Sequence, residues 1–311
     1  GTTVATRSFA CKQIIAKYLR ETADNLSGLD FKLHDFGARG VSSQESAAIS
    51  GLAHLVNFKG TDTLAAVLAA KRYYNEKNMP AFSIPAAEHS TITSWGRDLE
   101  KEAYRNMLKQ FLAKDKLVAV VSDSYNLWQA LEMWGTEFKT TIEQSQGTLV
   151  IRPDSGNPVE VVLKTMQTLD RLFGCAPNAK GYKVLPSYIR VIQGDGVNIH
   201  SIEEILKTLK DAGYSADNIA FGMGAGLLQK LDRDTLKFAM KASAVQINGV
   251  WHDVYKDPIT DHGKQSKRGR LALIKDGAGR LQTIPLGDIG THANVLRPVY
   301  RNGRLLADDT L

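Results

Sequence analysis

Residues 149–156, with the sequence LVIRPDSG, show the pattern that is most informative about the architecture. A short apolar run ends abruptly in a polar turn that contains Pro and Gly, and a helical pattern follows. Such a run is typical of a strand that is buried on both faces of a parallel sheet, and the polar cluster marks its end. The stretch therefore predicts one strand–loop–helix unit.

The same order of strand, polar loop and helix recurs along the chain. Strands are expected at residues 31–33, 55–58, 82–84, 118–121, 149–151, 190–192 and 219–221. Helix signals include capping boxes at Ser42 with Glu45 and Ser201 with Glu204, and one apolar face of Leu99, Ala103, Met107 and Phe111. About seven such units favour a closed or nearly closed parallel α/β barrel over an open sheet. The loops after the strands then share one rim, where ligands bind.

The pattern changes from about residue 236 onward. Segments such as residues 245–250 alternate between apolar and polar side chains, and Asn248-Gly249 is a hairpin signal. We therefore expect two parts, an α/β barrel catalytic domain over residues 1–235 and a small antiparallel β-rich unit over residues 236–311, packed on the barrel.

Composition narrows the class of protein. The 311 residues carry 39 Lys and Arg against 33 Asp and Glu, a net charge of +6 that suits phosphate-bearing small molecules and would also suit weak nucleic-acid binding. The basic stretch at residues 264–270 has no interleaved aromatics, so we expect no nucleic-acid partner. No apolar run could span a bilayer and no signal peptide is visible, so a cytoplasmic location without membrane attachment is the default expectation. Cys11 and Cys175 form neither a disulfide framework nor a metal-binding spacing, and no residue is assigned as a metal ligand.

Residues 222–226, GMGAG, follow a predicted strand and precede a helical pattern. Small residues let backbone N–H groups close on an anion at such a point, which favours a phosphate site. Arg233 could complete that site with a bidentate guanidinium. Glycines that serve only a turn, and an Arg233 that is only a solvated helix charge, remain open alternatives.

Charged side chains follow other strands. Asp154 and Asp195 each lie beside Gly just past a strand, where a carboxylate can accept from ribose hydroxyls and stabilise an oxocarbenium-like transition state, or can simply cap a turn. Arg152 stands directly before Asp154, and a cation beside an anion suits a ligand with both phosphate and hydroxyls. His89, at a helix start, is by itself as well explained as a cap or a core histidine. These residues together indicate electrostatic catalysis on a phosphorylated sugar.

Several longer motifs extend this interpretation. They are HDFGARG at 34–40, FKGTD at 58–62, PAAEH at 85–89, IRPDSGNP at 151–158, QGDG at 193–196 and GLLQK at 226–230. Together, in this order over nearly the whole chain, they resemble the nicotinamide phosphoribosyltransferases, which are type II phosphoribosyltransferases. The resemblance implies a homodimer with an irregular α/β barrel that joins nicotinamide to 5-phosphoribosyl 1-pyrophosphate. The products would be nicotinamide mononucleotide and pyrophosphate, in NAD biosynthesis or salvage, with Mg²⁺ and with ATP as an optional stimulating co-substrate.

The resemblance also implies roles for single residues. Phe36 would stack on the pyridine ring, Asp62 would accept from the carboxamide NH₂, and Ser122 would lie nearby. The pyrophosphate would be held by Arg39, His89 and Arg152. His89 would also be the residue that is phosphorylated when ATP is consumed.

The remaining roles concern the phosphorylated ribose. Asp154 and Asp195 would bind the ribose hydroxyls. The backbone at Gly194, Gly224 and Ala225, with the Arg233 side chain, would hold the 5-phosphate.

The chain also departs from the pattern of this family. Asn126 stands where Asp is expected, Ala225 where Gly is expected and Ala38 where Tyr is expected. The N-terminal segment that supplies an aromatic across the dimer is absent from the sequence, so we expect a folded but poorly active fragment. Nicotinate phosphoribosyl transfer and a non-catalytic phosphosugar-binding module remain alternatives, and Asp62 favours the amide over the acid.

Overall fold

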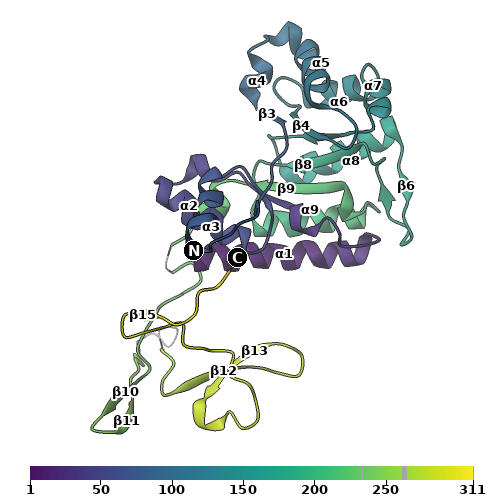
Figure 1. Cartoon of the computed structure of the whole chain (residues 1–311). Helices are drawn as coiled ribbons and strands as arrows, with labels where there is room; N and C mark the ends of the chain where they lie inside the picture. The colour runs from purple at the N-terminus through teal and green to yellow at the C-terminus, as the bar shows by residue number, and fades with distance from the viewer. Residues whose placement is uncertain (233, 261–264, 311) are drawn as a thin grey trace. The chain divides into compact units, whose positions relative to one another are not determined.

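The computed structural model describes residues 1–232, 234–260 and 265–310. The chain separates after Asp232 into two compact units, the first beginning at Gly1 and the second ending at Thr310 (Figure 1). The sequence predicts this boundary between the two units at residues 235 and 236.

A seven-stranded sheet forms the centre of the first unit, in the order β2-β1-β9-β8-β5-β4-β3. Its strands are β1 Leu33–Asp35, β2 Gly60–Thr61, β3 Ala86–Ala87, β4 Leu117–Val121, β5 Thr148–Arg152, β8 Ile189–Gln193 and β9 Ile219–Met223. All neighbouring strands in it are parallel. A separate pair, β6 Ala176–Pro177 and β7 Lys183–Val184, is antiparallel. The predicted parallel α/β architecture is therefore confirmed.

The two edges of this sheet are joined through the segment that leads into β3. The amide of Phe82 donates to the carbonyl of Lys59, and the amide of Thr61 in β2 donates to the carbonyl of Phe82. Further along, the amide of Ala119 in β4 donates to Pro85. One segment thus bonds to β2 at its start and to β4 at its end, which makes the barrel nearly closed and irregular, as predicted.

Helices cover the sheet of the first unit (Figure 1). They are α1 Thr2–Thr22, α2 Gln44–Leu55, α3 Leu64–Tyr73, α4 His89–Thr93, α5 Glu100–Phe111, α6 Leu127–Gly135, α7 Lys139–Ser145, α8 Pro158–Phe173, α9 Ile199–Asp211 and α10 Ala225–Leu228, with the 3₁₀ turns η1 Leu29–Phe31, η2 Ala38–Gly40, η3 Arg97–Leu99 and η4 Ala216–Asn218. No helix among residues 1–232, 234–260 and 265–310 is long and apolar enough to cross a membrane.

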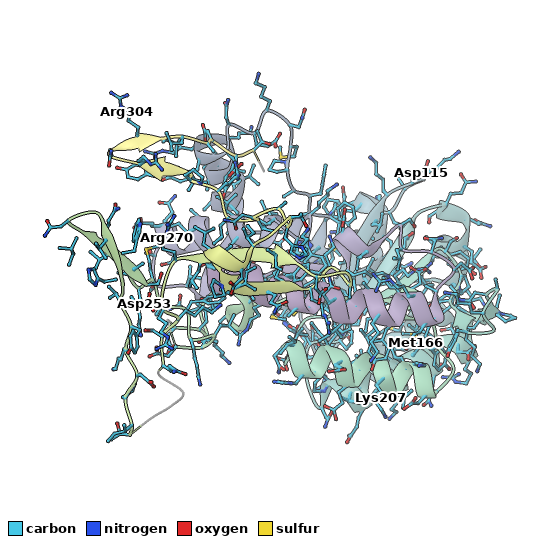
Figure 2. The ribbon with its side chains drawn as sticks, turned by 90° about the horizontal axis from the view of Figure 1, so that it is seen from below. Asp115, Met166, Lys207, Asp253, Arg270 and Arg304 are labelled. Carbon is cyan, nitrogen blue, oxygen red and sulfur yellow. The ribbon has the colours of Figure 1, made fainter. Side chains whose placement is uncertain are left out.

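Helix α8 shows how the sequence produces these elements. Asn157 accepts from two helix amides, and Pro158 occupies the first turn, where its missing N–H costs nothing. Met166, on the inner face of α8, is fully buried, whereas Lys207 on α9 projects into solvent (Figure 2). Periodic apolar residues thus place the helices against the sheet.

Two helix starts differ from the predicted capping boxes. The cap of α2 is Ser43 rather than Ser42, and the cap of α9 is Asn198, so Ser201 is the third helical residue. Both caps have the extended backbone that this position requires. The spacing of polar residues alone does not distinguish neighbouring candidates.

Three strands are displaced from their predicted positions. Of the 31–33 segment only Leu33 belongs to β1, because Phe31 ends the η1 turn. In the 55–58 segment, Leu55 ends α2 and the amide of Phe58 bonds to the carbonyl of His54, so the strand begins only at Gly60. In place of the strand expected at 82–84, β3 begins at Ala86. The apolar character of Phe58 reflects complete burial in the core and not strand pairing.

The second unit consists of short antiparallel hairpins. Its elements are β10 Ala244–Ile247, β11 Val250–Asp253, β12 Leu271–Lys275, β13 Leu281–Pro285, β14 Tyr300–Arg301 and β15 Arg304–Leu305, with the 3₁₀ turn η6 Leu286–Asp288. Asn248 and Gly249 both have positive φ in the turn between β10 and β11, which confirms the predicted hairpin. Packing of this unit on the barrel stays a prediction.

One buried histidine lies behind the sheet edge. The His54 ring is fully buried, stacks on Phe58 at 5.3 Å between centroids, and pairs through Nδ1 with Ser8 Oγ at 2.9 Å. Burial lowers the pKa of His54 from 6.5 to about 4. The folded protein therefore keeps this imidazole neutral.

The stability of the protein should fall as the pH drops from about 6.5 to about 4. In that window His54 is protonated in the unfolded chain and neutral in the folded chain. The free energy of unfolding therefore falls by about 1.4 kcal/mol for each pH unit of acidification. Urea unfolding across this range measures the effect. A His54→Gln variant should show a flatter pH dependence, and exposed His252→Gln should behave as the native protein. Equal slopes for native and His54→Gln would contradict the assignment.

Candidate active site

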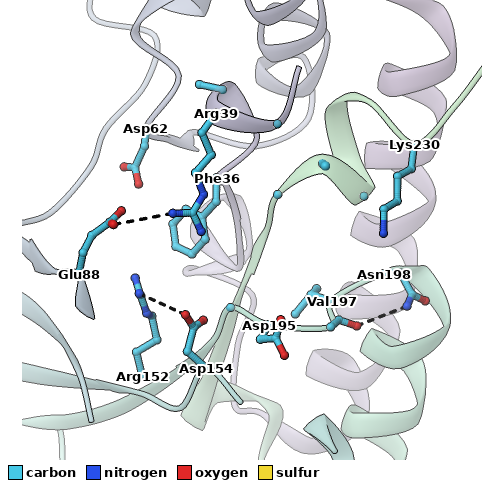
Figure 3. Close-up of a pocket in the computed structure, with 17 residues that line it drawn as sticks. Phe36, Arg39, Asp62, Glu88, Arg152, Asp154, Asp195, Val197, Asn198 and Lys230 are labelled. Carbon is cyan, nitrogen blue, oxygen red and sulfur yellow. Dashed lines mark hydrogen bonds and ion pairs between the residues drawn. The ribbon is translucent and has the colours of Figure 1, made fainter. Parts of the chain in front are cut away.

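The loops that follow the parallel strands surround a cavity of about 640 Å³ in the first unit (Figure 3). The predicted residues that line it are Phe36, Arg39, Asp62, Arg152, Asp154, Gly194, Asp195, Gly224 and Ala225. They come from segments far apart in the sequence. They meet here because parallel strands bring their carboxyl ends to one rim. The structure thus brings together most of the residues singled out from sequence.

Arg152 supplies a cation with unused hydrogen-bond donors. Its side chain is 12% exposed, and its Nη2 lies 3.4 Å from Asp154 Oδ2 (Figure 3). Its buried Nε has no partner among the described groups. A buried guanidinium is normally satisfied. The spare donors therefore suit an anionic ligand.

Arg39 is a second cation at the cavity, but it is held loosely. Its Nη1 lies 3.7 Å from Glu88 Oε2, and both side chains are mostly exposed (Figure 3). Exposed ion pairs of this kind contribute little energy, so the guanidinium is free to turn toward a ligand.

Asp154 lies in a crowded group of charges. Burial raises the pKa of its carboxyl, as do the negative charges of Asp123 and Asp195, whereas Arg152 and His89 act in the opposite direction. The ionised form of Asp154 is thus less stable, relative to the protonated form, than it is for an isolated Asp. Hydroxyl donors or a cation brought by a ligand would relieve this cost.

Asp123 is a residue that the sequence interpretation did not assign. Its side chain is only 4% exposed and accepts three hydrogen bonds, from His89 Nε2, from the Asp154 amide and from Ser155 Oγ. One carboxylate thereby ties the loop after β4 to the start of α4 and to the loop after β5. Its position in the polar cluster after a predicted strand was the signal that could have identified it.

His89 begins α4 and stands beside the cavity lining. Because Asp123 Oδ1 accepts from Nε2 at 3.0 Å, the proton of a neutral ring is on Nε2. The other nitrogen, Nδ1, lies 3.8 Å from Asp154 Oδ2. The ring is partly exposed and is oriented by Asp123 with Nδ1 toward the acidic loop.

The glycine-rich segments form the far end of the cavity. Gly222 and Met223 belong to β9, so the loop itself is short, and α10 begins at Ala225. Arg7 Nη1 donates to the carbonyls of Gly226 and Lys230, which fixes the end of this segment.

Lys230 is a further residue at that end that was not assigned from sequence. It lines the cavity, and its side chain extends toward Asn198 in Figure 3. Arg233, predicted to bind the phosphate, lies outside the described residues.

An apolar cavity of about 710 Å³ lies inside the barrel and shares Phe36, Asp62, Glu88 and Arg152 with the rim cavity. Ile84 and Val150 are among its lining residues. A Cβ on Gly222 would lie 2.0 Å from the Phe36 ring, so only glycine allows the ring to take this position. The junction of the two cavities can therefore take a flat apolar ring that carries a polar substituent.

Ser122 is not brought to either cavity. Its side chain is fully buried, donates to the carbonyl of Val120 and accepts from Trp134 Nε1 at 3.1 Å. Both interactions belong to the core beneath α6. The position of the side chain does not support the predicted contact near the pyridine ring.

No three His, Cys, Asp or Glu side chains converge as a metal site in the described part of the chain. Mg²⁺ typically takes one or two carboxylates and completes its shell with water and substrate phosphates. Asp154 and Asp195 at the rim fit that arrangement. The site therefore suits a metal that arrives together with a phosphorylated ligand.

Comparison with known proteins agrees with this geometry. Residues 31–304 match the model of the nicotinate phosphoribosyltransferase (NAPRTase) family. The chain belongs to this family. The resemblance inferred from the short motifs is therefore confirmed at the level of the family.

Named relatives in the family are nicotinamide phosphoribosyltransferases. The protein from Xanthomonas campestris pv. campestris (strain 8004) is 57% identical over 316 residues, which cover 99% of this chain and 67% of that protein. The protein from Mycoplasma pneumoniae is 38% identical over 282 residues, covering 86% of this chain and 60% of its own length. The protein from Acinetobacter baylyi is 32% identical over 331 residues. The chain spans only 60% to 67% of the length of the first two relatives.

A solved structure shares the fold of the family. The crystal structure of nicotinate-nucleotide pyrophosphorylase from Pyrococcus furiosus superimposes with a TM-score of 0.60 over 98% of this chain and 65% of that one. Sequence identity is 14%, so the likeness concerns the fold alone.

Asp123→Ala should loosen the loop after β5. Alanine has no acceptor for the three donors of the native carboxylate, so the Asp154 amide should lose protection against hydrogen exchange, by about tenfold for roughly 1.4 kcal/mol of lost hydrogen bonding. Hydrogen exchange of residues 153–156 measures this. The exposed Asp98→Ala serves as the control. Unchanged protection of the Asp154 amide would show that Asp123 does not hold the loop.

Proposed function

We propose that the protein transfers 5-phosphoribosyl from 5-phosphoribosyl 1-pyrophosphate to nicotinamide, in NAD biosynthesis or salvage. The products are nicotinamide mononucleotide and pyrophosphate. The proposal is carried by Asp62, which lies with Phe36 where the polar rim cavity meets the apolar cavity (Figure 3). The names of the relatives support the same reaction.

The base would occupy this junction. A pyridine ring stacks on Phe36, and its carboxamide NH₂ donates to Asp62. Hydrogen bonds and charge from His34, with Ser83 and Arg152, outweigh the effect of burial and lower the pKa of Asp62. Asp62 is thus an ionised acceptor that suits an amide and repels a ligand carboxylate.

The phosphorylated ribose would lie across the rim. Asp154 and Asp195 accept from the ribose hydroxyls and stabilise positive charge that develops at the sugar. The backbone at Gly194, Gly224 and Ala225 holds the 5-phosphate, and Arg233 is proposed to assist.

The leaving pyrophosphate would be neutralised by Arg39, His89 and Arg152. The pyridine nitrogen has a free lone pair, so its attack on the anomeric carbon requires no general base. Catalysis then rests on positioning and on electrostatic stabilisation. Mg²⁺, held by Asp154 or Asp195 together with the diphosphate, would supply further neutralisation of the leaving group.

Other parts of the proposal concern context. We expect ATP to act as an optional stimulating co-substrate through phosphorylation of His89. The enzyme is proposed to be a cytoplasmic homodimer with a shared active site, and without nucleic-acid or membrane partners. These features follow from the family resemblance and from composition.

Nicotinate is the alternative base, because both the family name and the Pyrococcus furiosus protein refer to it. Nicotinate carries a carboxylate where nicotinamide carries a carboxamide. In the structure this group would face Asp62, so the charge of Asp62 favours nicotinamide.

The full-length enzyme should turn over nicotinamide with a kcat/KM at least about tenfold above that for nicotinate, which corresponds to roughly 1.4 kcal/mol. Asp62→Asn should narrow this ratio, because a neutral amide no longer repels a carboxylate. Steady-state assays with both bases measure it, and Asp211→Asn on the surface of α9 is the control. A preference for nicotinate would refute the proposal, and absence of pyrophosphate release with either base would favour a non-catalytic binding module.

A further inference from the structure

The Asp62 carboxylate is not a free acceptor, because one of its oxygens is already occupied. Oδ1 accepts from His34 Nε2 at 2.9 Å and from Ser83 Oγ at 2.5 Å. A carboxylate oxygen offers two lone pairs, so these donors use both. Among the described groups none donates a hydrogen bond to Oδ2, which is the oxygen left for a ligand.

His34 is confined by two neighbours, Gly60 and Phe36. It belongs to β1, directly opposite Gly60 of β2, and a Cβ on Gly60 would lie 2.7 Å from its Nδ1. Its ring packs against Phe36 with 5.1 Å between centroids. The side chain is only 15% exposed. The imidazole therefore has little freedom to leave Asp62.

Ser83 reaches Asp62 from the segment that joins the edges of the barrel. It is exposed, and its hydroxyl donates to Asp62. His34 and Ser83 thus approach the same oxygen from two different elements. This convergence is more than sheet formation needs, since neither bond belongs to the backbone pairing of β1 and β2.

We infer that His34 and Ser83 are positioning residues that make Asp62 an acceptor-only group, and that they thereby select a carboxamide over a carboxylate in the base. The inference rests on the proposed function, whose base-binding group it describes. With both donors on Oδ1, the carboxylate keeps one rotamer and stays ionised. Oδ2 can then accept from the NH₂ of an amide but offers no proton to an acid.

Loss of the donors would change what Asp62 can bind. Without His34 and Ser83, burial favours protonation of Asp62, as it does for other carboxyls with few partners. A protonated carboxyl donates a hydrogen bond and can accept a nicotinate carboxylate. The preference for nicotinamide over nicotinate should then weaken, although Asp62 itself is still present.

The test compares kcat/KM for nicotinamide and for nicotinate in full-length variants. His34→Ala should lower the ratio of the two values by about tenfold, because Asp62 loses a hydrogen bond to its charged carboxylate. His34→Gln places an amide donor near the position of Nε2 and should restore most of the ratio. Ser83→Ala should lower it by about threefold. The KM for 5-phosphoribosyl 1-pyrophosphate should not change.

Two controls distinguish a change in the choice of base from a loss of folding. His252→Ala removes an exposed histidine of the second unit and should leave the ratio unchanged. Circular dichroism confirms folding, and the exposed Ser83→Ala keeps the test informative if His34→Ala does not fold. Equal losses of kcat/KM for nicotinamide and for nicotinate in the folded His34 variants would overturn the inference. If His34→Ala does not fold, an unchanged ratio in Ser83→Ala would overturn it. The proposed function fails separately, if the native enzyme prefers nicotinate.

Discussion

Parallel strand pairing determines where the loops of the first unit lie. Every strand of the main sheet runs in the same direction, so every loop at a carboxyl end must open on the same rim. Asp35 shows the constraint at close range. Its buried carboxylate accepts from the Gly37 amide and from Thr61 Oγ1, and its carbonyl accepts from the Asp62 amide. The loops that carry Phe36 and Asp62 are thereby fixed to each other before any ligand is present.

The site combines two different environments that share part of their lining. Above the rim, Arg152 and Asp154 lie in a cavity dominated by charges and glycine backbone. Below it, the surface of the cavity inside the barrel is largely apolar. A ligand with a charged sugar phosphate at one end and a flat ring at the other matches both. Asp62 lines both cavities where they join.

Most of the rim could be predicted from sequence, because an apolar run followed by a polar cluster reports both a strand and its carboxyl end. The method failed where apolar residues serve packing instead of pairing, as at Phe58. The sequence pattern also does not distinguish Ser122 from Asp123, adjacent residues at one strand end. Which of the two faces the loops and which faces Trp134 depends on the rotation of the chain after β4, and this is set by tertiary packing.

The barrel closes through a short segment rather than through a long strand. Phe82 bonds to β2, and the same segment then carries Ser83 to Asp62 and leads into His89. The seam of the barrel is therefore also a wall of the binding pocket. A ligand that contacts residues on both sides of the seam must share its binding energy with closure of the sheet, so affinity and the rigidity of the barrel are thermodynamically linked.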